Sequence, residues 1–240
     1  MAPDVAIPIL LYHKIGRPPR GARVPGQYVS PKLFRRHLSY LGSKGHQTVS
    51  LLSVAERDCP IPARPLVITF DDGYRCIYEE ALPALHEHGF SATVFLVAGA
   101  LGGSNVWEQA RGDVAEALLG LAEVQKMRVA GIEFGSHTLT HARLTALAPE
   151  EAAREIADSR ARLEDALGAP CLSFAYPYGG WNAQVRSLVA EAGYRVACTT
   201  RRAAARLSDD LLGLPRINVR RYNLLPWFRY KLWRARRTRS

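Results

Sequence analysis

Two adjacent carboxylates follow a short apolar run in the first third of the chain. Leu66 to Phe70 is apolar apart from Thr69 and is followed directly by Asp71, Asp72 and Gly73. Such a run is typical of a strand buried in a parallel sheet. Two acids at its carboxyl end would repel each other and lose hydration, which is costly unless a metal ion, a cation or a shared proton compensates. A polar turn is an equally good interpretation of these residues alone, because Asp-Gly is common in turns.

Two histidines follow a second short run, residues 132–135. His137 and His141 are four residues apart, so we expect them on one face of a helical turn, within reach of a single ion. Imidazole and carboxylate are ordinary ligands of zinc and other divalent transition metals. This spacing alone favours solvated or capping histidines. Together with the strand-terminal acid pair, it favours a metal site.

Three motifs resemble those of a known family. They are Thr-Phe-Asp-Asp-Gly at 69–73, Ser-His-Thr-Leu-Thr-His at 136–141 and Phe-Ala-Tyr-Pro-Tyr-Gly at 174–179. In order and separation they resemble the first three motifs of the polysaccharide deacetylase family, the NodB-homology domain of carbohydrate esterase family 4. The resemblance implies a distorted, incomplete (β/α)7 barrel and a hydrolase that removes N-acetyl groups from amino sugars.

The resemblance also implies roles for the motif residues. Asp72, His137 and His141 would bind a divalent metal, with zinc the default and cobalt, nickel or manganese as alternatives. Asp71 would be the general base, and the backbone N–H of Tyr178 would stabilise the tetrahedral oxyanion. The residue types alone do not show which of the two acids binds the metal and which is the general base.

A further histidine lies near the start of the chain. His13 follows Tyr12 at the end of an apolar run, and the sequence has no histidine after His141. This is similar to deacetylases of the permuted poly-N-acetylglucosamine type, in which the catalytic acid comes from the start of the chain. His13 is therefore the predicted acid that protonates the leaving amine.

The chain departs from the family pattern at two points. Ala175 occupies the position where the third motif usually has an arginine that faces the catalytic base, and the usual Asp-Trp motif is not evident. Arg216, in Leu214-Pro215-Arg216-Ile217-Asn218, is our hypothesis for a replacement of the missing arginine.

The remaining sequence predicts alternating strands and helices, which indicates parallel βα units. Helices are expected from Pro31 with Ser30 as its cap, over 77–88 with an interruption at Pro83, over 114–128, from Pro149 to Gly168, and after Asn182 as a cap. A doubly wound open sheet is the alternative to a barrel, but no GxGxxG fingerprint supports a dinucleotide site. Strands are expected near residues 8, 67, 92, 133, 173, 195 and 214, the last from Leu212 to Val219.

Composition is that of a globular protein, with 48% hydrophobic and 22% charged residues. We expect residues 1–240 to form one domain. The four widely spaced cysteines do not indicate a disulfide framework. No secretory signal or membrane-spanning run is present. We therefore expect a cytoplasmic or membrane-peripheral location, and an exported form stays open if a leader has been trimmed.

The net charge is +10, from 32 basic and 22 acidic residues. A basic, aromatic tail at about 226–240 could lie on anionic lipid, bind nucleic acid or dock an acidic partner, or could simply be solvated. No recognised nucleic-acid motif is present, so we expect a glycan or amino-sugar substrate and no nucleic acid.

The sequence therefore predicts a metal-dependent N-deacetylase of an N-acetylated sugar in a glycan. Three alternatives remain at this point. They are a deacetylase of a small N-acetylamino sugar, a carbohydrate-binding pseudoenzyme, and a non-haem iron oxygenase, which also uses two histidines and one carboxylate.

Overall fold

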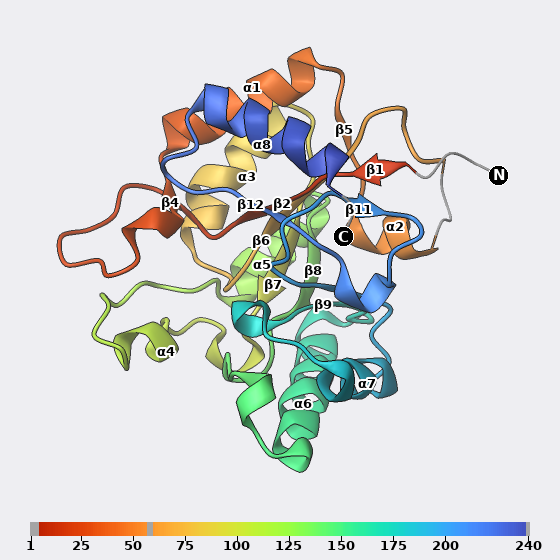
Figure 1. Cartoon of the computed structure of the whole chain (residues 1–240). Coiled ribbons are helices and arrows are strands. Elements are labelled where there is room, and N and C mark those ends of the chain that lie inside the picture. Colours follow the sequence, from red (N-terminus) through yellow and green to blue (C-terminus); the bar gives the residue numbers. More distant parts are fainter. Residues whose placement is uncertain (1–4, 57–59, 239–240) are drawn as a thin grey trace.

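The computed structural model describes residues 5–56 and 60–238. Its centre is a curled sheet in which all neighbouring strands are parallel (Figure 1). The strand order is β10-β9-β8-β7-β6-β2-β12, and β5 pairs beside β6. This confirms the distorted, incomplete barrel rather than the open doubly wound sheet. The strands are β2 (Ile9–Tyr12), β5 (Gln47–Thr48), β6 (Pro65–Phe70), β7 (Thr93–Leu96), β8 (Glu133–Ser136), β9 (Ser173–Ala175), β10 (Val196–Cys198) and β12 (Ile217–Asn218).

One segment, residues 214–218, links the two edges of the curled sheet. Leu214 pairs in parallel with Cys198 of β10, whereas Ile217 pairs with Leu10 of β2. The prediction of one continuous strand over 212–219 is wrong. Residues Leu211–Gly213 form a 3₁₀ turn, and only Ile217–Asn218 form a strand, because Pro215 has no N–H to donate to a ladder. Arg216 lies between the two pairings.

Alternation along β6 separates two hydrophobic clusters. Val67 packs with Ile9, Phe95 and Val196 in one cluster, whereas Ile68 and its neighbours belong to the larger one beneath the helices. Successive side chains of a strand point to opposite faces, so the smaller cluster fills the barrel interior. Asp71 continues the row of inward positions at the carboxyl end of β6.

Helices cover the outside of the sheet (Figure 1). As predicted, Ser30 caps the first helix, Asn182 caps the seventh and Gly168 ends the sixth in a left-handed conformation. None of the helices in the described ranges is long and apolar enough to span a bilayer. The helices are α1 (Pro31–Ser43), α2 (Leu51–Glu56), α3 (Leu82–Glu87), α4 (Val106–Gln109), α5 (Leu121–Val129), α6 (Pro149–Leu167), α7 (Ala183–Glu191) and α8 (Leu225–Arg237).

Two helix predictions need comment. The expected helix over 77–88 is a π-helical turn, Ile77–Ala81, followed by α3, with Pro83 in its first turn. The helix expected over 114–128 begins only at Leu121. The residues before it are extended, because Leu118 pairs with Tyr74 and Ala117 with Ser104. Tertiary pairing overrides local helix propensity there.

Two small sheets lie beside the barrel. Strand β1 (Ala6–Ile7) pairs antiparallel with β11 (Ala205–Arg206). Strand β3 (Lys14–Ile15) pairs in parallel with β4 (Tyr28–Val29). The second sheet orders the loop after β2, whose residues reach the mouth of the barrel.

Candidate active site

The carboxyl ends of the central strands surround a cavity of about 400 Å³. Active sites of βα barrels lie on this face. Six of the seven predicted site residues line the cavity: His13 after β2, Asp71 and Asp72 after β6, His137 and His141 after β8, and Tyr178 after β9. The seventh, Arg216, is fully buried behind Asp71.

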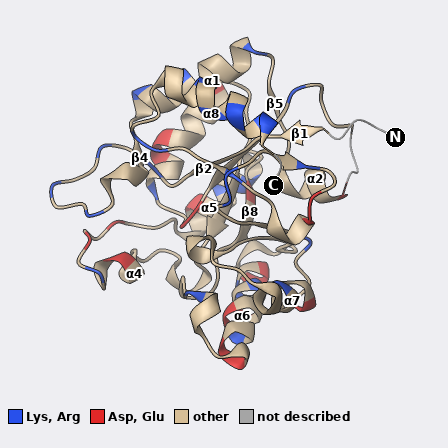
Figure 2. Ribbon diagram, in the orientation of Figure 1, with Lys and Arg blue, Asp and Glu red and all other residues tan. Residues whose placement is uncertain are grey.

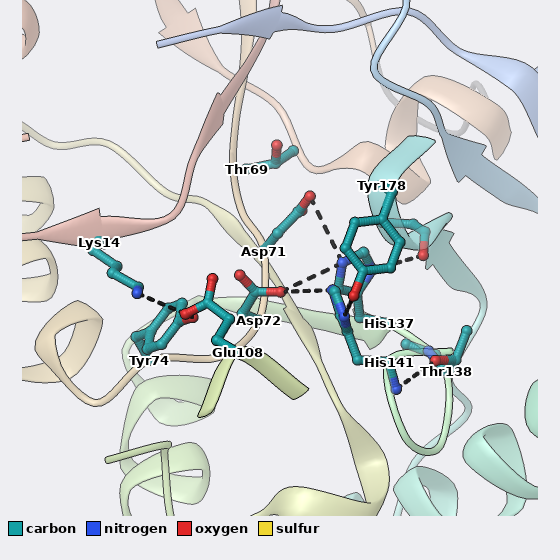
Figure 3. Close-up of polar contacts among 12 residues, drawn as sticks. Lys14, Thr69, Asp71, Asp72, Tyr74, Glu108, His137, Thr138, His141 and Tyr178 are labelled. Carbon is teal, nitrogen blue, oxygen red and sulfur yellow. Dashed lines mark hydrogen bonds and ion pairs between the residues drawn. The ribbon is translucent and has the colours of Figure 1, made fainter. Parts of the chain in front are cut away.

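Asp72, His137 and His141 form a compact cluster (Figure 3). Asp72 Oδ1 lies 3.2 Å from His141 Nε2 and 3.6 Å from His137 Nε2. One ligand atom from each residue lies within 4.8 Å of the others, and all three side chains are buried. Asp72 Oδ1 has no hydrogen-bond partner among the described residues. Three buried N and O donors around one point, with an unsatisfied carboxylate oxygen, fit a divalent metal ion.

Hydrogen bonds orient both imidazoles for ligation. His137 Nδ1 lies 2.7 Å from the carbonyl oxygen of Ala175 and must donate to it, which leaves the Nε2 lone pair facing Asp72. His141 Nδ1 lies 3.0 Å from the Tyr178 hydroxyl. Such outer contacts fix the tautomer of a metal-ligating histidine. Burial lowers the pKa of both rings, that of His141 to about 4, so both are neutral at pH 7.

The backbone around the cluster is strained. Among the described non-glycine residues, only Asp72, Thr138, His141 and Tyr178 have positive φ, between 60° and 72°. The two histidines therefore do not lie on a helical turn, and that prediction is wrong. Instead, left-handed residues fold the loop after β8, and Thr138 Oγ1 accepts the backbone N–H of His141 at 3.0 Å. Such strain is typical of functional sites.

Asp71 and Arg216 form a bidentate ion pair. Nη1 and Nη2 of Arg216 lie 2.7 and 2.8 Å from the two oxygens of Asp71. Arg216 Nε also donates to the carbonyl of Thr199 at 2.9 Å. Burial opposes ionisation of Asp71, but Arg216 and the nearby histidines outweigh it and lower its pKa to about 2. Asp71 is thus held as a carboxylate, outside the three-residue cluster, with Oδ2 3.9 Å from His137 Nε2.

His13 faces the same cavity from the end of β2, the strand that pairs with β6. Its Nδ1 has no hydrogen-bond partner among residues 5–56 and 60–238. Burial lowers its pKa, while Asp72 and Asp71 oppose this effect. The ring is therefore free to exchange a proton with a group in the cavity.

Aromatic side chains form the outer wall of the cavity. The Trp107 ring stacks on His141 with 4.7 Å between centroids. The guanidinium groups of Arg111 and Arg143 each lie over the Tyr178 ring, at 4.8 and 4.5 Å from its centroid. Sequence reasoning used only the backbone of Tyr178, whereas its hydroxyl also contacts His141.

A buried polar network on the other side of Asp72 was not predicted (Figure 3). Glu108 lines the cavity and accepts from Lys14 Nζ at 2.9 Å, from Tyr74 at 2.8 Å and from Asn105 at 2.9 Å. Lys14 also pairs with Glu116 at 2.6 Å. The position of Lys14 directly after His13 is the only feature of the local sequence that points to this network, because Glu108 and Glu116 lie more than 90 residues away along the chain.

Comparison with known proteins supplies the family. A family model described as polysaccharide deacetylase matches residues 60–197, more than half of the chain. The chain belongs to the polysaccharide deacetylase family. All three motifs lie inside this range, whereas His13 and Arg216 lie outside it.

Individual members of the family resemble the chain over most of its length. It is 28% identical over 216 residues to the putative polysaccharide deacetylase YxkH of Bacillus subtilis, covering 89% of this chain and 71% of that one. The deacetylase PplD of Streptococcus pyogenes, solved with acetate, aligns with a TM-score of 0.81 and 25% identity over 95% of this chain and 98% of that one. IcaB from Ammonifex degensii shares the fold, with a TM-score of 0.79 and 24% identity over 97% and 98%. Membership of the polysaccharide deacetylase family supports a hydrolase that deacetylates polysaccharide.

Proposed function

We propose that this protein is a metal-dependent N-deacetylase of an N-acetylated amino sugar in a polysaccharide or oligosaccharide. The observation that carries the proposal is that two adjacent acids in one cavity have different surroundings, one suited to binding a metal and the other to accepting a proton. Asp72 joins two neutral histidines in a ligand cluster, while Asp71 is ionised and held by Arg216. Hydrolysis of an amide needs both an activated water and a base to take its proton.

Asp72, His137 and His141 would hold the metal. Zinc is the default, with cobalt, nickel or manganese as alternatives. When bound, the ion would acidify a water molecule and polarise the acetamide carbonyl. Asp71 then takes the proton of the attacking water, and Arg216 keeps that carboxylate ionised and correctly oriented.

The remaining groups act on the tetrahedral stage of the reaction. The backbone N–H of Tyr178 donates to the developing oxyanion. His13, in the protonated form that the nearby Asp72 and Asp71 favour, protonates the leaving amine, which an amide requires because its unprotonated nitrogen leaves poorly. Acetate, the product of this hydrolysis, is the molecule with which PplD was solved.

The direct test is acetate release from N-acetylglucosamine, chito-oligosaccharides and poly-N-acetylglucosamine, with and without added zinc or cobalt. Acetate that disappears with chelator and in Asp71→Asn is the expected result, while Asp210→Asn is the control, because Asp210 is a carboxylate paired with Arg186 away from the cavity. Release from the monosaccharide alone would favour a small-sugar deacetylase. No acetate from any substrate would contradict the proposal and favour a binding protein.

The role of His13 can be separated from that of Asp71. An aryl acetate has a leaving group that needs no proton. His13→Ala should therefore lose about 10²- to 10⁴-fold on the amide but far less on 4-nitrophenyl acetate. Asp71→Asn should lose activity on both. Equal losses on both substrates in His13→Ala would contradict the acid role.

A further inference from the structure

A second pocket of about 410 Å³ lies beside the catalytic cavity. The two hollows share one wall, made by Arg202, Asn218 and Arg220, each of which lines both. The far side of the second pocket is formed by α8, through Trp227, Tyr230, Lys231, Arg234, Ala235 and by Thr238 just beyond it. A sugar bound in the catalytic cavity therefore lies next to residues that also line this pocket.

Four cations line the second pocket without a carboxylate to balance them. They are Arg202, Arg220, Lys231 and Arg234, and none forms an ion pair with an acid in the described part of the chain. Within residues 5–56 and 60–238, Lys231 Nζ donates only to neutral oxygens, the Asn218 carbonyl and Asn223 Oδ1, both at 2.8 Å. Burial, followed by the charges of Arg202 and Arg220, lowers the pKa of Lys231 to about 8. The pocket therefore has an excess of positive charge.

The three arginines of the second pocket are exposed and Lys231 is half-buried, whereas the buried cations elsewhere in the described residues are paired with acids. Lys14 is balanced by two glutamates, and Arg216 is balanced by Asp71. Helix α8 itself has basic residues and no acid, as Figure 2 shows. Unpaired cations that share a recess repel one another, and a bound anion relieves that repulsion.

Aromatic rings accompany these cations. Helix α8 packs on α1 through Phe228, whose ring stacks on His37 with 3.9 Å between centroids. The opposite side of α8 leaves Trp227 61% and Tyr230 43% exposed where they line the pocket. Amphipathic rings beside charged donors suit a ligand that has both an apolar face and a polar group. A sugar with a charged substituent has this character.

We propose that the second pocket binds a negatively charged group, a phosphate or a carboxylate, on the glycan whose N-acetylated sugar occupies the catalytic cavity. This inference rests on the proposed deacetylase function and adds its substrate class, an anionic glycan. A lipid surface is the main competitor for α8. It is disfavoured because two of the four cations, Arg202 and Arg220, also line the catalytic cavity, whereas a lipid surface would need only the basic residues of α8.

Three oligosaccharides of equal length test the proposal. Chitotetraose is neutral, its 1-phosphate has a phosphate, and a tetrasaccharide that alternates glucuronate with N-acetylglucosamine has carboxylates. We expect kcat/KM to be at least about 10-fold higher for one charged substrate than for the neutral one, as one charge-assisted contact would give. High salt should reduce this preference. The preferred charged substrate identifies the anion.

The variant Arg202→Gln/Arg220→Gln should reduce the charged-to-neutral ratio of kcat/KM about 10-fold. The control Arg221→Gln/Arg229→Gln removes two charges that line neither pocket and should leave the ratio as it is. A ratio near one in the unaltered protein, or an equal fall in both variants, would overturn the proposal. So would binding to anionic vesicles that requires Arg202 and Arg220, without any substrate preference.

The two proposals fail differently. Acetate released equally from all three substrates removes the anion site and leaves the deacetylase intact. If no substrate releases acetate, calorimetric titration of the charged oligosaccharides into the protein still measures whether the second pocket binds them. Binding that is lost in Arg202→Gln/Arg220→Gln would support the anion site, and no binding would overturn it.

Discussion

At the scale of single residues, the buried Arg216 pairs with Asp71 from a position outside the third motif. A buried carboxylate that must act as a base needs a cation nearby to stay ionised. The third motif has Ala175 where an arginine is usual, and its carbonyl instead accepts from His137. Arg216 reaches Asp71 from the segment that links the edges of the barrel. We propose that Arg216 meets the same geometric requirement from this linking segment.

Replacing Arg216 should change the pH dependence of the reaction. In Arg216→Met, burial of Asp71 is no longer opposed by its main cation, so its pKa rises from about 2. A base is inactive below its pKa, so the acidic limb of the kcat/KM profile should move to higher pH. At pH 7, kcat/KM should fall about 10- to 100-fold, the usual cost of losing an orienting partner, while metal content holds.

Controls separate this effect from misfolding. Loss of Arg216 leaves a buried unpaired charge, and stability should fall by about 3–5 kcal/mol. Arg216→Met/Asp71→Asn removes that charge and should recover much of the stability, as urea unfolding would show, without recovering activity. Arg201→Met alters a neighbouring arginine that does not contact Asp71 and should leave the profile in place. An unshifted acidic limb in Arg216→Met would make Arg216 merely structural.

At the scale of elements, strands and caps were predictable because their signals are local. Apolar runs marked the strands that position the site, and Ser30 and Asn182 cap their helices as expected. The histidine loop was not predictable. The i, i+4 spacing implies a helical turn, but positive φ at Thr138 and His141 is stabilised by contacts across the site that no local pattern encodes.

The contact between α1 and α8 should be sensitive to acid. His37 is fully buried there, accepts from Tyr12 at 3.1 Å and donates to the carbonyl of Asn223 at 2.8 Å. Burial lowers its pKa from 6.5 to about 4. The unfolded chain therefore binds this proton first, so stability is fully present above pH 6.5 and falls as the pH drops toward 4.

From pH 7 to pH 5, His37 should account for a loss of about 2 kcal/mol in unfolding free energy. Urea denaturation at both pH values measures the loss. His37→Gln should remove this part of the pH dependence, even though its stability at pH 7 is also lower. The exposed His86→Gln is the matched control. If both variants keep the full pH dependence of the unfolding free energy, unfolding does not change the proton binding of His37.

At the scale of the whole molecule, the features that escaped prediction are those that distant segments build together. The link across the barrel edges joins residues 214–218 to β10 and β2, and the second pocket joins the segment around Asn218 to α8. The tail predicted at about 226–240 is a packed helix over Leu225–Arg237. The basic, aromatic composition of this segment is visible in the sequence. The sequence does not show which face of the helix is buried or which pocket the helix lines.

The ligand cluster joins β6 to β8, so metal binding should stabilise the folded barrel as a unit. An ion at 100 times its dissociation constant adds about 2.7 kcal/mol, which for a chain of this size raises the melting temperature by about 5–10 °C. Differential scanning calorimetry of the chelated and zinc-loaded protein measures the shift.

Asp72→Asn should lose this shift in melting temperature together with activity. Asp71→Asn should keep much of it while inactive, because Asp71 lies outside the cluster. An undiminished shift in Asp72→Asn would mean that the metal binds elsewhere. The adjacent acids are therefore distinguishable in solution, one by its effect on stability and the other by its effect on catalysis alone.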